Sequence, residues 1–542
     1  MKKYLAASLL ALGFSCNSNE NNNKDTTAVQ VDQETLARHI ETLASDDFMG
    51  RMPFTEGEEK TVNYLQEEFS KLGVSPGNGD SYFQEVPLVE ITGTPSETMK
   101  ISGQGTEFDL EFFEEFVALT LKPEEEVSLE NSELVFAGYG IVAPEYGWND
   151  YEGVDWEGKT AVVLVNDPGF ATGDSTLFKG NEMTYYGRWT YKYEEAGRQG
   201  AAGVIIIHET EPASYGWNVV QSGWTGAQLN LESDAPVADV QGWVTREAAE
   251  KLFEASTLEN KNYNELALSD GFKATPMGIN ASVSITNEID RNTSKNVIAV
   301  VEGSERKDEY IFYTAHWDHL GIGRPIEGDS IYNGAVDNAS GTAALIAIAE
   351  AFKKGEQPKR SIAFIAVTAE EQGLLGSAYY AENPIFPPEK TVAVINIDAL
   401  QSPGKMKDLT ITGFGHSEMD EYAKEAAEKQ DRYIIPDPEA EKGFFYRSDH
   451  FNFAKIGIPA LYASGSHEGF DMSAGEVKAM NDEYSANRYH QPSDEYDPET
   501  TELSGVREDL QLFYEIGLKL ANEDYFPKWY EGSEFKAARE KN

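Results

Sequence analysis

Residues 360–377 read RSIAFIAVTAEEQGLLGS, in which an apolar run leads directly into two adjacent glutamates, Glu370 and Glu371. The run has the composition of a strand that is buried on both faces of a sheet. Like charges repel, and removing a carboxylate from water is costly. In isolation, the pair is most simply interpreted as a solvated turn before a helix, where glutamate is favourable. The surrounding sequence decides whether a functional interpretation is better.

The same alternation extends on both sides of this stretch, from residue 275 onward. Apolar runs predict strands over 296–303, 309–319, 391–399, 409–415 and 458–464, and residues 340–354 and 417–430 have the pattern of helices. Apolar strands that alternate with helices indicate a mainly parallel sheet covered by helices on both faces. Such sheets bind ligands at the C-terminal ends of their strands.

Imidazoles and carboxylates lie at or after the ends of these strands, separated by whole strand-helix units. They are His316, Asp318, Asp337, Glu370, Glu371, Asp398 and His490. A two-metal site requires a bridging carboxylate, one carboxylate and one imidazole for each metal, and a free carboxylate as a base. Two cations would also offset the repulsion between the adjacent glutamates.

Each member of this set has a simpler interpretation when it is taken alone. His316 could be a core histidine, Asp337 could cap the helix that begins near Ser340, and His490 could be a surface residue. Asp398 is harder to explain, because an apolar strand rarely ends in an unpaired acid. The occurrence of all of them in this order is much more specific than any single member.

The motifs that carry these residues resemble those of the co-catalytic di-zinc exopeptidase family. That family includes bacterial leucine-type aminopeptidases, glutamate carboxypeptidase and the transferrin receptor. The motifs are AHWDHLG, GAVDNASG, TAEEQGLLGS, NID and YHQPSDE, in the family's order, and GRMPFTEGE resembles its N-terminal signature. The resemblance covers residues 31–95 and 275–520, and residues around 130–275 resemble the protease-associated domain that is inserted in many members.

The resemblance implies a role for each residue of the set. Asp337 would bridge two metals, with His316 and Asp398 completing one site and Glu371 and His490 the other. The metals would be two zinc ions, which suit histidine and carboxylate ligands, with manganese and cobalt as alternatives.

The resemblance also implies which groups act on the substrate. Glu370 would be the general base, Asp318 would orient the ring of His316, and Tyr489 would donate to the oxyanion. Arg324 and Arg447 lie near the motifs, and a structural salt bridge is a simpler interpretation of each than a substrate contact.

The expected fold is therefore α/β, a mainly parallel but mixed sheet flanked by helices in an αβα sandwich, with an inserted β-rich α/β protease-associated domain. Strands are predicted over 134–142, 159–167 and 201–209 of that insertion, and a helix over 188–200. The expected segments are a signal peptide (1–16), a flexible tether (17–30), the first part of the peptidase domain (31–100), the insertion (101–275) and the second part of the peptidase domain (276–542).

The N-terminus has the pattern of an export signal. MKK is basic, YLAASLLALGF is apolar, and the small residue Ser15 precedes Cys16, the single cysteine of the chain. A lone cysteine at this point resembles the lipid-attachment site of bacterial lipoproteins, and the alternative is an ordinary signal peptide with an incidental cysteine. We therefore expect an exported protein, in the periplasm or as a lipoprotein of the outer membrane or cell surface, with membrane contact only through Cys16.

The net charge of −49, from 93 acidic against 44 basic residues, argues against a nucleic-acid partner. A single cysteine excludes a disulfide scaffold.

We weigh four functions, of which the first is favoured. It is an aminopeptidase that acts on peptides with free N-termini, because Asp449 and Asp494 add to an acidic neighbourhood that suits an amine. The second is a carboxypeptidase, which needs cationic groups for a carboxylate; only Arg324, Arg447 and Arg488 lie near the motifs. The others are a glutaminyl cyclase, a relative that uses one zinc, and a non-catalytic tethered peptide-binding protein. The oligomeric state and the preferred N-terminal residue do not follow from the sequence.

Overall fold

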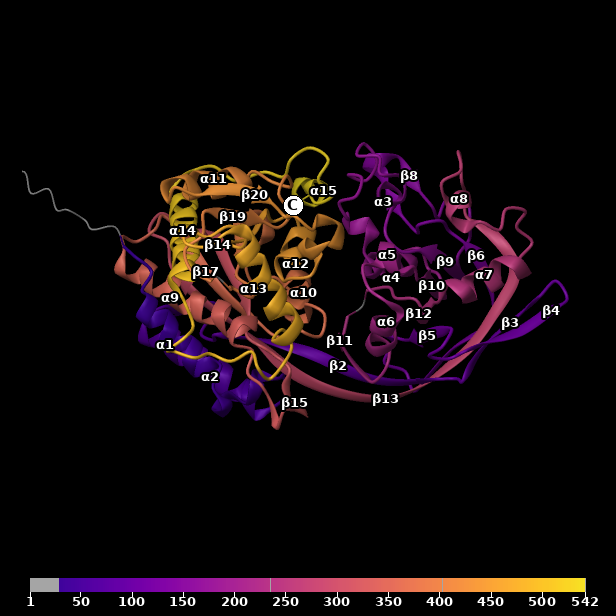
Figure 1. Cartoon of the computed structure of the whole chain (residues 1–542), viewed down its shortest axis with the longest axis horizontal. Helices are drawn as coiled ribbons and strands as arrows, with labels where there is room; N and C mark the ends of the chain where they lie inside the picture. Colours follow the sequence, from indigo (N-terminus) through magenta and orange to yellow (C-terminus); the bar gives the residue numbers. More distant parts are fainter. Residues whose placement is uncertain (1–28, 234, 402, 542) are drawn as a thin grey trace, which may run out of the picture.

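Residues 29–233, 235–401 and 403–541 are described by the structure, a computed structural model. The expected signal peptide (1–16) and residues 17–28 of the expected tether lie outside this range. The described chain forms two lobes connected by two long strands, β2 (Phe83–Pro95) and β13 (Thr275–Val301) (Figure 1). Residues 29–95 and 286–541 are termed the main lobe, and residues 96–285 the inserted lobe.

The strand β13 belongs to both lobes. Its first half pairs with β3 (Thr98–Gly103) and β6 (Glu126–Phe136) in the inserted lobe, and its second half pairs with β2 and β17 (Arg360–Val367) in the main lobe. The boundaries expected at 100/101 and 275/276 fall inside β3 and at the first residue of β13. A hydrogen-bonded sheet, rather than a flexible linker, therefore connects the lobes.

The main lobe is built on a mixed sheet with the order β2–β13–β17–β14–β18–β21–β19–β20. The strands not yet defined are β14 (Arg306–His316), β18 (Thr391–Asn396), β19 (Asp408–Ile411), β20 (Tyr433–Pro436) and β21 (Ala460–Ser464). Strands β17, β14, β18 and β21 run parallel to one another, whereas β13 and β19 run antiparallel to their neighbours β17 and β21. Every residue of β17 and β18 is buried, in agreement with the apolar runs of the sequence.

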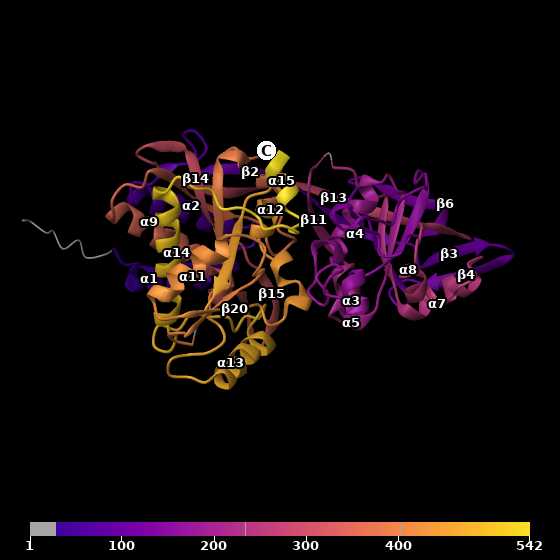
Figure 2. The same ribbon diagram turned by 90° about the horizontal axis from the view of Figure 1, so that it is seen from above.

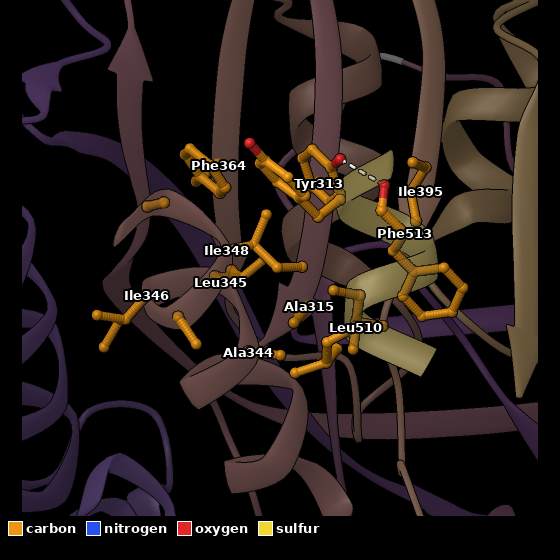
Figure 3. Packing of buried hydrophobic residues seen from close by; sticks show 14 of the residues in the cluster. Tyr313, Ala315, Ala344, Leu345, Ile346, Ile348, Phe364, Ile395, Leu510 and Phe513 are labelled. Atoms are coloured by element: carbon orange, nitrogen blue, oxygen red, sulfur yellow. Dashed lines mark hydrogen bonds between the residues drawn. The ribbon is translucent and has the colours of Figure 1, made fainter. Parts of the chain in front are cut away.

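Helices cover both faces of this sheet, which confirms the predicted αβα sandwich. One face packs against α1 (Gln33–Leu43), α2 (Glu56–Lys71), α9 (Ser340–Lys354), α11 (Met419–Lys429) and α14 (Ser504–Asn522). The other face packs against α10 (Leu375–Glu382) and α12 (His450–Lys455). On the first face, Tyr313 of β14 stacks on Phe364 of β17 and donates its hydroxyl to the carbonyl oxygen of Phe513 at 2.8 Å (Figure 3).

The main lobe also contains β1 (Ser75–Pro76), a hairpin of β15 (Gly321–Ile326) and β16 (Asp329–Tyr332), α13 (Ala474–Asn487) and α15 (Lys536–Lys541).

The inserted lobe has its own sheet, in which β6, β9 (Lys159–Leu164), β10 (Gly203–Ile207) and β12 (Val240–Val244) are parallel and β5 (Phe116–Leu119) is antiparallel to β12. The hairpin of β3 and β4 (Thr106–Glu111) lies at the end of the lobe that is distant from the main lobe (Figure 2). The predicted helix over 188–200 is confirmed as α4 (Trp189–Arg198).

The remaining elements of this lobe are β7 (Val142–Ala143), β8 (Trp148–Asn149), β11 (Ala227–Leu231), α3 (Pro168–Thr172), α5 (Thr210–Ala213), α6 (Trp217–Gly223), α7 (Arg246–Ala255) and α8 (Tyr263–Ala267). Within the part of the chain that the structure describes, no helix has both the length and the apolar character needed to cross a bilayer.

Candidate metal centre

The parallel strands of the main sheet deliver the predicted residues to one edge. His316 is the last residue of β14, the two glutamates follow β17, and Asp398 follows β18. Asp337 lies between β16 and α9, and His490 follows α13. The structure therefore brings together all five residues that were expected to bind metal.

These five residues form two groups that share Asp337. In the first group, His316 Nε2 lies 3.2 Å from Asp337 Oδ1 and 3.1 Å from Asp398 Oδ1. In the second, His490 Nε2 lies 3.3 Å from Asp337 Oδ2 and 3.0 Å from Glu371 Oε2. Each oxygen of Asp337 thus faces a different histidine, which is the arrangement of a bridging ligand. We refer to the two groups as the His316 half-site and the His490 half-site.

The donor set and its charge fit two divalent cations. Several carboxylates converge here with little solvent, which is costly unless cations compensate them. Burial lowers the pKa of His316, but the charges of Glu370 and Asp398 outweigh it and raise the pKa well above its usual value. His490 Nε2 is shielded from solvent, and although oxygens of Asp337 and Glu371 lie close to it, none of the described residues meets it in hydrogen-bond geometry. Imidazole nitrogens and carboxylate oxygens grouped around two centres are ligands that suit zinc.

A turn separates the roles of the two adjacent glutamates. β17 ends at Val367, and Ala369 has a φ of 52°, so the alternation of a strand has stopped before the pair begins. A ligand atom of Glu370 groups with His316 and Asp398, whereas Glu371 lies in the His490 half-site. Burial raises the pKa of Glu370 well above its usual value, with a further contribution from the charge of Asp398. A carboxyl with a raised pKa suits proton transfer.

Asp318 supports this turn. Its carboxylate accepts the backbone N–H of Glu370 at 3.1 Å and that of Glu371 at 3.4 Å. The expected contact with the ring of His316 is made by the backbone instead: Nδ1 lies 3.2 Å from the carbonyl oxygen of Asp318 and 3.8 Å from its carboxylate. The side chain therefore orients the glutamates, and the main chain orients the imidazole.

Sequence reasoning missed His319. Its side chain is fully buried, Nδ1 lies 2.6 Å from Glu371 Oε1, and Nε2 has no partner among the described residues. The second histidine of AHWDHLG was a signal that could have identified it.

Two further positioning groups were also missed or left without a role. Asp494 is fully buried and accepts the backbone N–H groups of Val336 and Asp337, so the segment after α13 fixes the loop of the bridging residue. Ser448 donates its hydroxyl to Asp398 Oδ2 at 2.5 Å.

Tyr489 and Asp449 lie beside the centre. Tyr489 is 45% exposed, and its ring stacks on that of His490 with 3.9 Å between centroids. Asp449 is fully buried and accepts the hydroxyl of Ser377 at 2.6 Å. Tyr489 is thus placed at the mouth of the centre and Asp449 behind it.

The arginines near the motifs are not in the expected salt bridges. Among the described residues, neither Arg324, on the exposed β15–β16 hairpin, nor Arg447 has a carboxylate within 4.0 Å, and that expectation was wrong. Arg447 donates to the carbonyl oxygen of Lys442 at 2.7 Å and lies over the ring of Phe444. Arg488 donates to two backbone carbonyls of its own loop.

A third arginine without a carboxylate partner among the described residues comes from the inserted lobe. Arg188 is 9% exposed, and its Nε has no partner among the described residues. Burial and the charge of Arg447 lower the pKa of Arg188 to about 10. Burial also lowers the pKa of Arg447, and the charge of Tyr489 partly opposes this shift. Arg188 and Arg447, one from each lobe, are therefore cations that influence each other's charge and have no carboxylate partner among the described residues.

Two tryptophans of the inserted lobe pack against that lobe's own core. Trp189 contacts Trp224 with 5.0 Å between ring centroids, and Trp217 donates its indole N–H to the carbonyl oxygen of Phe113. This packing favours the structural interpretation of both tryptophans.

Comparison with known proteins adds to this geometry. Residues 296–512 match the family "Peptidase family M28". "Aminopeptidase NAALADL1" of Mus musculus is 37% identical over 143 residues, which are 25% of this chain and 18% of the mouse protein. "Probable glutamate carboxypeptidase LAMP1" of Arabidopsis thaliana is 29% identical over 256 residues, which are 43% of this chain and 33% of the plant protein. The chain therefore matches only a minor part of the length of these two relatives.

Among solved structures, "Aminopeptidase from Aneurinibacillus sp. strain AM-1" aligns over 92% of this chain and 96% of its own, with 21% identity and a TM-score of 0.49.

Proposed function

We propose that the chain, whose residues 296–512 match peptidase family M28, is a metal-dependent aminopeptidase with two metal sites, which hydrolyses the N-terminal peptide bond of peptides. The observation that carries this proposal is the position of Asp337, whose two oxygens lie 3.2 Å from His316 Nε2 and 3.3 Å from His490 Nε2. A single metal would not require two such half-sites around one carboxylate.

The fit of the donor set assigns the ligands. Asp337 would hold both metals, His316 and Asp398 one of them, and Glu371 and His490 the other. Two divalent cations would polarise the scissile carbonyl and increase the acidity of a water molecule. We propose zinc for both, because imidazole and carboxylate ligands suit it.

The protein's own residues would then move the proton. The Glu370 carboxylate takes a proton from the attacking water as its oxygen bonds to the carbonyl carbon. Glu370 then delivers this proton to the nitrogen of the leaving amine as the C–N bond breaks. Tyr489, at the mouth of the centre, is placed to donate to the carbonyl oxygen as negative charge develops on it. Asp318 and His319 hold the glutamates in position during these steps.

Two features favour the amino end of the substrate. A free α-amine is compatible with a site surrounded by Glu370, Asp398 and Asp449, whereas a carboxylate entering that field would be repelled. One relative is named an aminopeptidase. Neither a glutaminyl cyclase with one zinc nor a binding protein would require a second complete half-site and a free base.

A second candidate, recognition of the carboxyl end, is favoured by one observation. Arg188 and Arg447 are cations without carboxylate partners, and guanidinium groups bind carboxylates well. Another relative is named a probable glutamate carboxypeptidase. If this pair held the terminal carboxylate of a substrate, the scissile bond would be the last one of the peptide.

Blocked peptides distinguish these functions. The purified protein is incubated with one pentapeptide in four forms: free, N-acetylated, C-amidated and blocked at both ends, with and without a chelator. We expect hydrolysis of the free and C-amidated forms, release of the N-terminal residue, and loss of activity with chelator. Cleavage of N-acetylated peptides together with refusal of C-amidated ones would instead establish a carboxypeptidase.

We also propose that the protein is exported and anchored through a lipid on Cys16. The support is the basic and apolar N-terminal pattern that precedes this single cysteine. Metabolic labelling with a radioactive fatty acid tests it: wild type should be labelled in the membrane fraction and Cys16→Ser should not. Equal labelling of both would reject the anchor.

A further inference from the structure

The N-terminal motif GRMPFTEGE contains a buried cation that the proposed mechanism does not use. Arg51 is the second residue of this motif, and its side chain is fully buried. It ends the short helical segment Asp46–Arg51, far from the metal ligands in the sequence. A buried arginine is unusual enough to require a physical reason.

The guanidinium of Arg51 joins the two loops that carry metal ligands. Nε donates to the carbonyl oxygen of Trp317 at 2.9 Å, and Trp317 lies between His316 and Asp318. Nη1 donates to the carbonyl oxygen of Asn333 at 2.6 Å, and Nη2 donates to that of Gly334 at 2.9 Å. Both residues lie just before the bridging aspartate, Asp337. A further bond from Nη1 to the carbonyl oxygen of Leu43 ties the group to the end of α1.

All four acceptors are backbone carbonyl oxygens, so the bonds fix main chain and not side chains. Among the described residues no carboxylate lies within salt-bridge distance of Arg51. Burial lowers the pKa of Arg51 to about 10, against the charges of Asp337 and Asp494, which raise it. The positive charge is therefore balanced by the acidic centre itself, across the two loops.

The backbone around Arg51 is built for this placement. Met49, Gly50 and Arg51 have φ values of 53°, 66° and 53°, a conformation that L-residues adopt only when surrounding contacts enforce it. A Cβ on Gly50 would lie 2.5 Å from the carbonyl oxygen of Tyr332 and 2.6 Å from that of Gly321. Glycine at this position allows the segment to approach the base of the β15–β16 hairpin.

We propose that Arg51 is a positioning residue of the metal centre, which sets the spacing between the loop of His316 and Asp318 and the loop of Asp337. The assignment rests on the proposed function, because it matters only if both half-sites bind metal. A single rigid fork that contacts both loops holds them at a fixed separation. Lysine has one nitrogen and cannot span the four carbonyls in the same geometry.

Arg360 provides a matched control. It is 1% exposed and donates to the carbonyl oxygens of Leu520 and Tyr525, so it is also a buried guanidinium bound to main chain, with one further bond from Nε to the carboxylate of Glu309 at 2.6 Å. It begins β17, at the end of the strand opposite to the metal centre. A purely structural role of Arg51 predicts that Arg51→Lys and Arg360→Lys behave alike.

The test measures metal affinity separately from activity. Chelator-treated wild type, Arg51→Lys, Gly50→Ala and Arg360→Lys are titrated with zinc against a chromophoric competitor, and the thermal unfolding midpoint of each metal-free protein is recorded. Gly50→Ala displaces the segment without removing the guanidinium. We expect Arg51→Lys and Gly50→Ala to bind zinc about 10–100-fold more weakly, as for other groups that position ligands. Arg360→Lys should retain wild-type zinc affinity to within about threefold, whatever its midpoint.

Each outcome is decisive. Wild-type zinc affinity in Arg51→Lys and Gly50→Ala would overturn the positioning role, and so would a loss in Arg360→Lys as large as theirs. Failure of both test variants to fold, while Arg360→Lys folds, would make Arg51 a folding residue and would also overturn it. If the wild type itself bound no zinc, the proposed function would fail instead, and the two failures are thus distinguished.

Discussion

His319 Nδ1 lies 2.6 Å from Glu371 Oε1, and this contact fixes which oxygen of Glu371 is available to a metal. The other oxygen, Oε2, lies 3.0 Å from His490 Nε2. One imidazole therefore orients the carboxylate, and the second would share its metal. His319 thus contributes to the His490 half-site, although His316, only three residues earlier in the chain, belongs to the other half-site.

Replacement of His319 should weaken one half-site selectively. His319→Ala removes the group that holds Glu371 Oε1, so the zinc affinity of one of the two binding steps should fall about 10–100-fold while the other changes little. His319→Asn, whose amide can donate a similar hydrogen bond, serves as the control and should lose less. Isothermal titration of the metal-free protein measures both steps. Equal weakening of both steps in His319→Ala would contradict the assignment.

The two adjacent glutamates should respond differently to substitution. Glu370→Gln should retain both metals and lose about 10²–10⁴-fold in kcat, because amide cannot accept the proton. Glu371→Ala should lose metal from the His490 half-site. Metal content by mass spectrometry, measured beside kcat, checks both. If the two variants lost the same metal, the separation of base and ligand would be incorrect.

The arginine pair should affect substrates that end in a carboxylate near the metals. Arg188→Ala and Arg447→Ala should raise KM for dipeptides about tenfold or more, since a charge-assisted hydrogen bond contributes about 1.5–3 kcal/mol. The same variants should leave KM for long or C-amidated peptides unchanged. Arg324→Ala, on the exposed hairpin, is the control. An unchanged dipeptide KM in both variants would mean that the pair has no part in binding.

A buried histidine between the lobes should make the folded chain less stable at acid pH. His416, in the main lobe, is buried, stacks on Phe445, and has Nε2 3.1 Å from Nζ of Lys179 in the inserted lobe. Burial, with a smaller contribution from the charge of Lys179, lowers the pKa of His416 to about 4. The usual value is about 6.5. Between these pH values the unfolded chain binds a proton that the folded chain does not. The free energy of unfolding should therefore decrease as the pH falls from about 6.5 to about 4, by roughly 3 kcal/mol from this group.

Denaturant unfolding at several pH values tests this effect. His416→Gln should show a flatter pH dependence than wild type across that interval. Substitution of the exposed His467 by glutamine is the control and should leave the slope unchanged. A wild-type slope in His416→Gln would show that this histidine does not couple folding to protons.

Part of this organisation follows from the sequence because three of the five ligands lie at or just after the ends of parallel strands. The runs that contain His316, Glu370 and Asp398 are apolar enough to be identified as parallel strands, and parallel strands place their C-terminal ends at one edge. The convergence of these strand ends was therefore expected, whereas Asp337 and His490 were assigned from the motif resemblance; the structure brings all five ligands together.

The supporting groups could not be predicted in this way, because their partners are set by tertiary packing. Arg51 donates to backbone carbonyl oxygens. Because every residue has one, the sequence does not indicate which of them Arg51 contacts. Asp318 was expected to contact an imidazole, yet its carboxylate meets the N–H groups of a turn whose shape depends on Ala369. A structural salt bridge was the simpler interpretation of Arg324 and Arg447, but nearness to the motifs in sequence does not place a carboxylate at either guanidinium.

Metal titration of the chelator-treated protein, with hydrolysis of a free N-terminal peptide measured after each addition, tests the two-metal centre most directly. The account predicts that two zinc ions bind per chain and that full activity appears only when the second is bound. Saturation at one metal per chain, with full activity and no further gain from a second, would contradict it.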